Sequence, residues 1–424
     1  MKIITRLGIN SLWLIAARIG TQIGMVLFTI LIARNLGSSA FGGYAFIAAL
    51  IMIGNVFTTF GTDMLLIRDI AATDELAWLS PALVIQIVLS LIFIGIVILA
   101  SSFMSNENKD TVLALQIYSL SLLPLAFYTV YSTALRGKQR MGVFTVLNLI
   151  LIFLQVCAAL WLVWKGGNLI TLAVLLLIVQ TLGTGLAGFL CSRQIRGLHL
   201  SWQFPIKQMR SLIKASAPIA LLSLLGVLYQ RLNLVMLPAL GGVEVTGWYS
   251  AAARVIEAAK IGHVAVFTAL YPLMAQVNAV DNSKLSQTFR LPWLLLLGGG
   301  VLASFVIGLL SKQIVTIAYG LDYSPSISIL NILAWMLVPY TINTFLSLAF
   351  LAQGNEGVVI GALTTGIIVL AVLTIWWEPL AGVRGAAWAA LTAESLQSII
   401  LVTQDSRKHH VLSAGGLNEF SKFS

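Results

Sequence analysis

Charged residues are scarce in this chain. Only 9% of its 424 residues are Asp, Glu, Lys or Arg, whereas a soluble domain carries about 25%. The hydrophobic share is 59% and the mean hydropathy is +0.96. A water-soluble globule of this composition would have almost no polar side chains to cover its surface. The chain is therefore an integral membrane protein, and its net charge of +10 bears first on its orientation in the membrane, not on nucleic acid.

Reactive cysteines and catalytic motifs are also missing. The two cysteines, Cys157 and Cys191, lie in apolar runs without a CxxC or paired His, so neither a disulfide nor a metal site is indicated. There is no P-loop, GxSxG or HExxH pattern, and no connecting loop is long enough to form an extramembrane domain. We therefore expect no enzyme, no cofactor and no metal site.

The chain instead holds twelve apolar segments of spanning length. Lys2 and Arg6 precede the first, as in a signal peptide, but this run spans the bilayer and lacks a cleavage pattern. The segments fall at 11–33, 43–60, 81–103, 111–134, 143–164, 168–191, 215–237, 248–275, 291–310, 325–351, 358–376 and 384–403. We predict an all-α membrane protein with an N-terminal six-helix bundle (1–191), a basic cytoplasmic linker (192–214), a C-terminal six-helix bundle (215–404) and a cytoplasmic tail (405–424).

Positive charge predicts the orientation of these spans. If the N-terminus is cytoplasmic, sixteen of the 25 Lys and Arg residues lie on the cytoplasmic side, five lie outside and four lie within spans. Because cytoplasmic loops carry an excess of Lys and Arg, this bias places both termini in the cytoplasm.

A repeat relates the two halves. Leu36-Gly37 precedes Phe41-Gly42-Gly43-Tyr44 as Leu240-Gly241 precedes Thr246-Gly247-Trp248-Tyr249, about 204 residues later. Pro124 likewise matches Pro339, and Arg136-Gly137 matches Gln353-Gly354. Since each half holds an even number of spans, we expect the bundles to be related by a pseudo-two-fold axis normal to the membrane. The alternative is that such short strings recur by chance.

Charged residues within the spans mark the candidate site. Arg254, Glu257 and Lys260 lie within an arc of about 120° on one helix, and Arg18 and Arg231 lie in other spans. Charges in a bilayer usually face a protein or water-filled interior, and a basic interior suits an anionic, phosphate-bearing substrate. Glu257 and Asp63 are the candidates for charge pairing or ion coupling, and Glu394 is a further acid in the last span. The structural alternative is that the triplet neutralises itself through its i,i+3 spacing.

The motif order resembles that of polysaccharide flippases of the O-antigen-repeat type, in the multidrug/oligosaccharidyl-lipid/polysaccharide exporter superfamily. The likeness covers nearly the whole chain. It rests on Ile32-Ala33-Arg34-Asn35-Leu36-Gly37, Ile67-Arg68-Asp69-Ile70-Ala71, Ala134-Leu135-Arg136-Gly137 and Tyr249-Ser250-Ala251-Ala252-Ala253-Arg254.

The resemblance implies that the protein moves an undecaprenyl-diphosphate-linked oligosaccharide from the cytoplasmic to the periplasmic leaflet of a bacterial inner membrane by alternating access. Arg18, Arg231, Arg254 and Lys260 would hold the diphosphate or acidic sugars. The expected partners are this lipid-linked substrate, membrane lipids, a coupling ion (H⁺ or Na⁺) and polysaccharide assembly proteins, with no nucleic acid. A cation-coupled multidrug antiporter of the same superfamily is the first alternative, and a membrane glycosyltransferase or polymerase is the second.

Overall fold

The computed structural model describes residues 2–103, 109–195, 200, 206–280 and 284–408, and the side chains of all of these except 2–12, 14–18, 261–290 and 407–408. The described residues outside short connections are helical. They form two compact units, residues 1–231 and 232–424, which are treated separately below. The division falls inside a helix, later in the chain than the linker 192–214.

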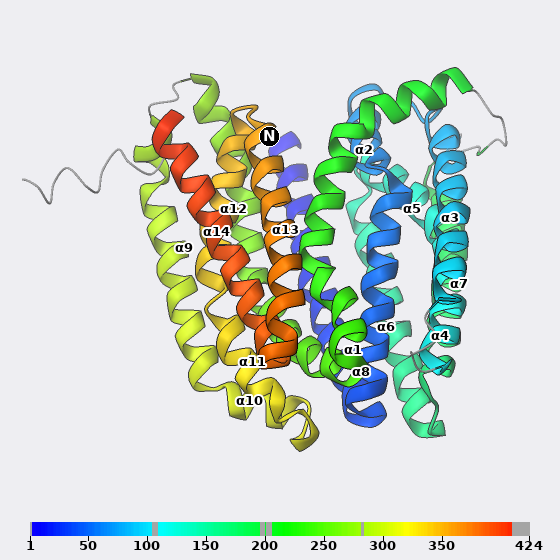
Figure 1. The fold of residues 1–424 in the computed structure, drawn as a ribbon. Helices are drawn as coiled ribbons and strands as arrows, with labels where there is room; N and C mark the ends of the chain where they lie inside the picture. Colours follow the sequence, from blue (N-terminus) through cyan, green and yellow to red (C-terminus); the bar gives the residue numbers. More distant parts are fainter. Residues whose placement is uncertain (1, 104–108, 196–199, 201–205, 281–283, 409–424) are drawn as a thin grey trace, which may run out of the picture. The chain divides into compact units, whose positions relative to one another are not determined.

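The first unit holds seven helices and the beginning of an eighth (Figure 1). These are α1 (Lys2–Thr59), α2 (Thr62–Thr73), α3 (Leu79–Ser101), α4 (Lys109–Ser119), α5 (Leu122–Gly137), α6 (Met141–Lys165), α7 (Leu169–Gln194) and α8 (Ile206–Val280). The second unit takes the rest of α8 and the helices α9 (Lys284–Leu309), α10 (Ser311–Ala318), α11 (Pro325–Ala334), α12 (Leu337–Ala352), α13 (Glu356–Ala381) and α14 (Val383–Lys408), with a short 3₁₀ turn η1 (Leu321–Tyr323).

Two glycines break the two longest helices. Gly37 interrupts α1 at φ 78° and ψ 174°, and Gly242 interrupts α8 at φ 88° and ψ 170°. Only glycine adopts this region readily, because a Cβ would clash with the backbone. Each break divides a run that is too long for one crossing, since the apolar parts extend over 41 and 55 residues at 1.5 Å per residue.

The number of spans agrees with the expectation. Among the described residues, nine helices are long and apolar enough to cross a membrane, and the bent pair α11–α12 supplies a tenth span. Two of the nine, the apolar parts of α1 and α8, are each divided by a glycine and so supply two spans. The total of twelve confirms the predicted all-helical membrane fold.

The internal repeat is visible in the helix boundaries. The helices α5 and α6 begin 215 residues before α12 and α13, and α7 begins 214 residues before α14. A residue with a positive φ follows the end of both α5 and α12: Gln139 (φ 57°) after α5 and Gly354 (φ 74°) after α12. These positions correct two details of the sequence alignment: Gly37 corresponds to Gly242 rather than Gly241, and Gly354 corresponds to Gln139 rather than Gly137.

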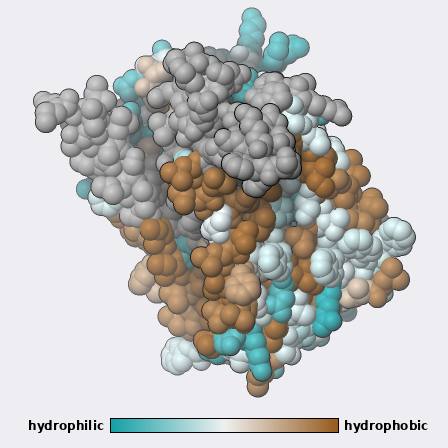
Figure 2. Space-filling model, turned by 90° about the vertical axis from the view of Figure 1, so that its left-hand side faces the viewer, coloured by the Kyte–Doolittle hydropathy of each residue, from teal (hydrophilic) through white to brown (hydrophobic). Residues whose placement is uncertain are grey.

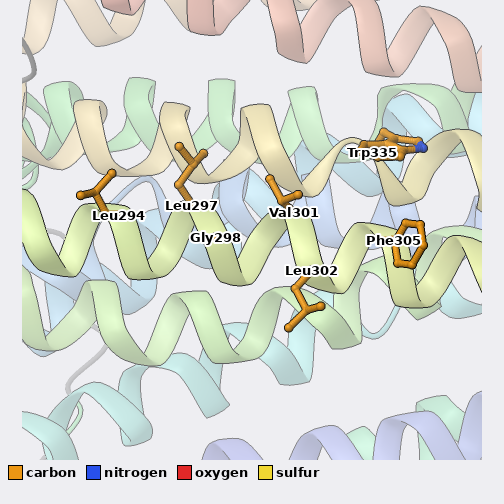
Figure 3. Close-up of a pocket in the computed structure, with 7 residues that line it drawn as sticks. All are labelled: Leu294, Leu297, Gly298, Val301, Leu302, Phe305 and Trp335. Atoms are coloured by element: carbon orange, nitrogen blue, oxygen red, sulfur yellow. The ribbon is translucent and has the colours of Figure 1, made fainter. Parts of the chain in front are cut away.

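The outer surface of α9 is strongly apolar. Leu295, Leu302 and Leu309 are each 64–69% exposed, and the side of the molecule drawn in Figure 2 is largely hydrophobic. A soluble protein rarely exposes such a surface, whereas a membrane-spanning helix presents it to lipid. A groove of about 550 Å³ runs along this helix (Figure 3). Its lining contains no charged side chain and consists of Leu294, Leu297, Gly298, Val301, Leu302, Phe305 and Trp335.

Candidate functional site

The second unit places an ion pair on the helical segment that follows the break at Gly242. Arg254 Nη1 lies 2.9 Å from Glu257 Oε2, and the side chains are 15% and 30% exposed. Their i,i+3 spacing puts them on one face of α8, as the sequence predicts. A partly buried pair is held by its charge-assisted hydrogen bond, and removing one partner leaves the other charge poorly solvated.

Tyr319, from the connection between α9 and α11, interacts electrostatically with this pair and packs against Tyr323. The rings of Tyr319 and Tyr323 are 5.5 Å apart, and both side chains are buried. Burial raises the pKa of Tyr319 to about 12, while the charge of Arg254 lowers it and that of Glu257 raises it. The phenol is therefore neutral at physiological pH and can donate a hydrogen bond.

Trp248 joins the same connection to the start of the charged segment. Its Nε1 donates to the carbonyl of Asp322 at 3.2 Å, and Ser326 Oγ donates to the Trp248 carbonyl at 2.8 Å. The sequence offered no signal for these contacts, because the partners are more than 70 residues apart in the chain.

Lys260 contacts a third element. Its Nζ lies 4.1 Å from the centre of the Tyr340 ring on α12, within the range of a cation–π interaction. One turn further along α12, Asn343 Nδ2 donates to Glu394 Oε1 and to the Glu394 carbonyl, both at 2.9 Å. Ser398 Oγ in turn donates to Asn343 Oδ1 at 2.8 Å. A row of polar groups thus leads from α8 across α12 to α14.

The repeat identifies an acid that is present in one unit only. On α7, Thr184 Oγ1 donates to the carbonyls of Gln180 and Pro124. On α14, Ser398 Oγ donates in the same way to the carbonyls of Glu394 and Pro339. Glu394 therefore occupies in the second unit the place that the uncharged Gln180 occupies in the first.

Asn233 forms a buried hydrogen-bonded junction in the second unit. Its Nδ2 donates to Tyr249 Oη at 2.9 Å and to the Ala386 carbonyl at 3.2 Å, and its Oδ1 accepts from Thr374 Oγ1 at 2.9 Å. These contacts join the two parts of α8 on either side of Gly242 and join α8 to α13 and α14, so the residue holds the helix packing together, which is the usual role of polar side chains between membrane helices.

The remaining predicted site residues belong to the first unit. Arg231 is 8% exposed, and its Nε donates to Met52 Sδ at 3.2 Å. Asp63 lies in the first turn of α2, where a carboxylate is favoured by the helix dipole. Arg18 lies on α1, but its side chain is outside the described part of the structure. The structure thus brings together Arg254, Glu257 and their neighbours within one unit. Within the described ranges it shows no group of three His, Cys, Asp or Glu side chains that could hold a metal.

Several solved structures that resemble this one are named as transporters or flippases. A multidrug resistance MATE family transporter of the MOP superfamily, in an inward-facing conformation, superposes with a TM-score of 0.76 at 13% identity, over 93% of this chain and 96% of that chain. The lipid II flippase MurJ, in an inward closed conformation, gives 0.76 at 16% identity, over 93% and 87%. A MOP superfamily transporter from Pyrococcus furiosus gives 0.66 at 14% identity, over 96% and 97%.

These likenesses show that the chain has the same fold as those proteins. The sequence itself matches the polysaccharide biosynthesis protein family over residues 7–278, which is more than half of the chain. The chain belongs to this family, which confirms the resemblance seen in its motifs. No curated protein matches it significantly.

Proposed function

We propose that this protein is a flippase that moves an undecaprenyl-diphosphate-linked oligosaccharide repeat unit from the cytoplasmic to the periplasmic leaflet of a bacterial inner membrane. Membership of the polysaccharide biosynthesis family carries this proposal. The MurJ fold match supports it, because that protein is named as a flippase of lipid II. Transport would proceed by alternating access, coupled to H⁺ or Na⁺ and in contact with polysaccharide assembly proteins.

The basic residues within the spans support an anionic substrate. Arg254 is the strongest candidate for a diphosphate contact, because its planar guanidinium can make two parallel hydrogen bonds where Lys260 offers a point charge. In the structure its Nη1 lies 2.9 Å from Glu257 Oε2. Substrate would displace this carboxylate, and Glu257 would hold the guanidinium again after release.

Substitution of Arg254 tests the proposal. Arg254→Ala should lower surface polysaccharide in a flippase-null strain at least about tenfold, because a hydrogen bond to a charged group contributes about 1.5–3 kcal/mol and 1.4 kcal/mol corresponds to a factor of ten. Arg254→Lys should retain part of the activity if charge dominates and lose most of it if the bidentate geometry does. The readout is surface polysaccharide at matched protein levels on a blot.

The double variant Arg254→Ala/Glu257→Ala separates this role from a structural one. If the two residues only neutralise each other, removing both restores a neutral helix and transport is normal. Full surface polysaccharide from the double variant would therefore remove Arg254 from the mechanism.

A cation-coupled multidrug antiporter is the second candidate, because structures titled as MATE transporters match the fold as well as MurJ does. It predicts that the protein lowers drug accumulation in cells without affecting surface polysaccharide. The buried Glu394 would then be the first acid to replace.

A further inference from the structure

The first three turns of α8, residues 206–216, form what we call the basic segment. It continues a long part of the chain that has no acidic residue at all, since none occurs between Asp110 and Glu244. Figure 1 shows the beginning of α8, in green, running across the ends of the first unit's helices before it turns to run along them. Pro218 follows shortly afterwards, and proline within a helix removes a backbone hydrogen bond and bends the axis.

One face of the basic segment fixes it to the first unit. Leu212 is 3% exposed, and it packs with Met209 into the hydrophobic cluster that contains Leu65, Ile70 and Leu135. Ser216, on the same face, is buried and donates to the Leu212 carbonyl at 2.8 Å. The i, i+3, i+7 spacing of these residues defines a single buried side.

The opposite face carries three cations. Lys207, Arg210 and Lys214 have the same i, i+3, i+7 spacing, all are exposed, and they lie within an arc of about 60°. The segment contains no acidic residue to balance them. It therefore presents a narrow positive stripe on the side turned away from the protein core.

Two exposed isoleucines lie between the buried face and the positive stripe. Ile206 is 76% exposed and Ile213 is 40% exposed, and they are one heptad apart on the same side of the helix. The other flank carries Gln208 and Ser211, which are polar and exposed. An exposed apolar pair beside a basic stripe is the pattern of a helix that lies in the membrane interface.

We infer that the basic segment binds the headgroups of anionic phospholipids in the leaflet that it faces. Lys207, Arg210 and Lys214 contact the phosphates, while Ile206 and Ile213 enter the boundary of the acyl chains. Charge complementarity selects this partner. Each Lys or Arg near an anionic surface contributes roughly a fivefold preference, so three give a preference on the order of a hundredfold over a neutral bilayer. The inference does not depend on the transported substrate.

Paired fluorescent probes test the inference on the full-length protein. In a Cys157→Ser/Cys191→Ser background, Ile206→Cys and Gln208→Cys are each labelled with an environment-sensitive dye and placed in nanodiscs of phosphatidylcholine with or without phosphatidylglycerol. The probe at 206 should shift to the blue and be quenched by spin-labelled lipid when phosphatidylglycerol is present. The probe at 208 should stay open to aqueous iodide in both, although it is only two residues away.

A matched charge removal completes the test. Lys207→Gln/Arg210→Gln/Lys214→Gln should abolish the lipid-dependent shift at 206. Lys109→Gln/Lys165→Gln/Lys312→Gln, which removes three exposed charges elsewhere, should retain it. Equal spectra at 206 in the two lipid mixtures would overturn the inference, as would a shift that survives in the first triple variant. A blue shift already present in phosphatidylcholine discs would also overturn it, because the anionic headgroups would then not be needed.

Discussion

At the scale of single residues, the internal repeat allows Glu394 to be compared with its counterpart in the first unit, Gln180. The two hydroxyl-to-carbonyl hydrogen bonds that Ser398 makes beside this residue recur at Thr184 beside Gln180, where the side chain is uncharged. These hydroxyl-to-carbonyl contacts therefore do not require a carboxylate at this position. The acid is kept in the second unit alone, buried in a span at 3% exposure, and a buried ionisable group in a membrane marks a functional position by default.

This comparison predicts different effects for two substitutions. Glu394→Gln should change the thermal unfolding midpoint little, because the amide oxygen can still accept the hydrogen bond from Asn343. Glu394→Ala should destabilise the protein by roughly 1 kcal/mol or more, because it removes that acceptor and leaves a cavity. Thermal unfolding in detergent, followed by tryptophan fluorescence, measures both. A Gln variant as unstable as the Ala variant would show that the carboxylate is needed for packing after all.

The sequence predicted the residue-scale contacts that are local. The Arg254–Glu257 pair follows from the i,i+3 spacing on one helix, and the structure places it so. The Tyr319–Tyr323 pair and Trp248 were not predicted, because helical periodicity does not reveal which connection packs against which span. The roles of Arg18, Arg231, Lys260 and Asp63 stay predictions, since burial and contacts alone do not define a ligand.

At the scale of helices, the two breaks require glycine because of their backbone conformation, and not because neighbouring atoms leave no room for a side chain. No atom lies within 4 Å of an added Cβ at Gly37 or Gly242. Both residues nevertheless adopt a positive φ in a region that is essentially restricted to glycine. The sequence repeat aligned Gly37 with Gly241, but it did not show that the neighbouring Gly242 carries the second break.

Alanine substitution should therefore separate backbone strain from sterics. Gly242→Ala should destabilise the protein by about 1–3 kcal/mol, the cost of a strained φ. Gly95→Ala on α3 is the matched control: its site is equally open and its φ is helical, so it should be neutral or stabilise by about 0.5–1 kcal/mol. Thermal midpoints of the two variants give the comparison. Equal shifts would contradict the assignment of strain to Gly242.

Span number was more predictable than helix boundaries. The predicted runs count twelve crossings correctly, because crossing a bilayer imposes both length and apolarity. The predicted span 43–60 ends at the interruption at Phe60–Gly61, but the interruption between α4 and α5, inside the predicted span 111–134, was not predicted, since it does not change the hydrophobicity of the run. Tertiary packing sets the conformation at these points. At Gly61, for example, a Cβ atom would lie 2.8 Å from the Ala220 nitrogen on α8.

At the scale of the whole molecule, composition predicts a membrane protein but not how the helices divide between the two units. The composition established a membrane protein, and the repeat of helix boundaries supports two related halves. The division between the units falls after Arg231 and not in the basic linker, because the beginning of α8 packs on the first unit through Leu212. Hydropathy could not indicate this, since it does not record which bundle a helix joins.

Orientation in the membrane is the prediction that belongs to this scale. The excess of Lys and Arg places both termini and the basic segment in the cytoplasm, and places the connections at Lys165 and Lys312 outside. In a Cys157→Ser/Cys191→Ser background, a cysteine at Lys312 should react with a membrane-impermeant thiol reagent in intact cells, whereas one at Gln208 should react only after the cells are opened. Both side chains are exposed, so a difference in labelling reports the side of the membrane and not burial. Labelling of Gln208→Cys from outside would reverse the topology. It would also place the positive stripe at the outer leaflet, so that the anionic headgroups it contacts would be those of that leaflet.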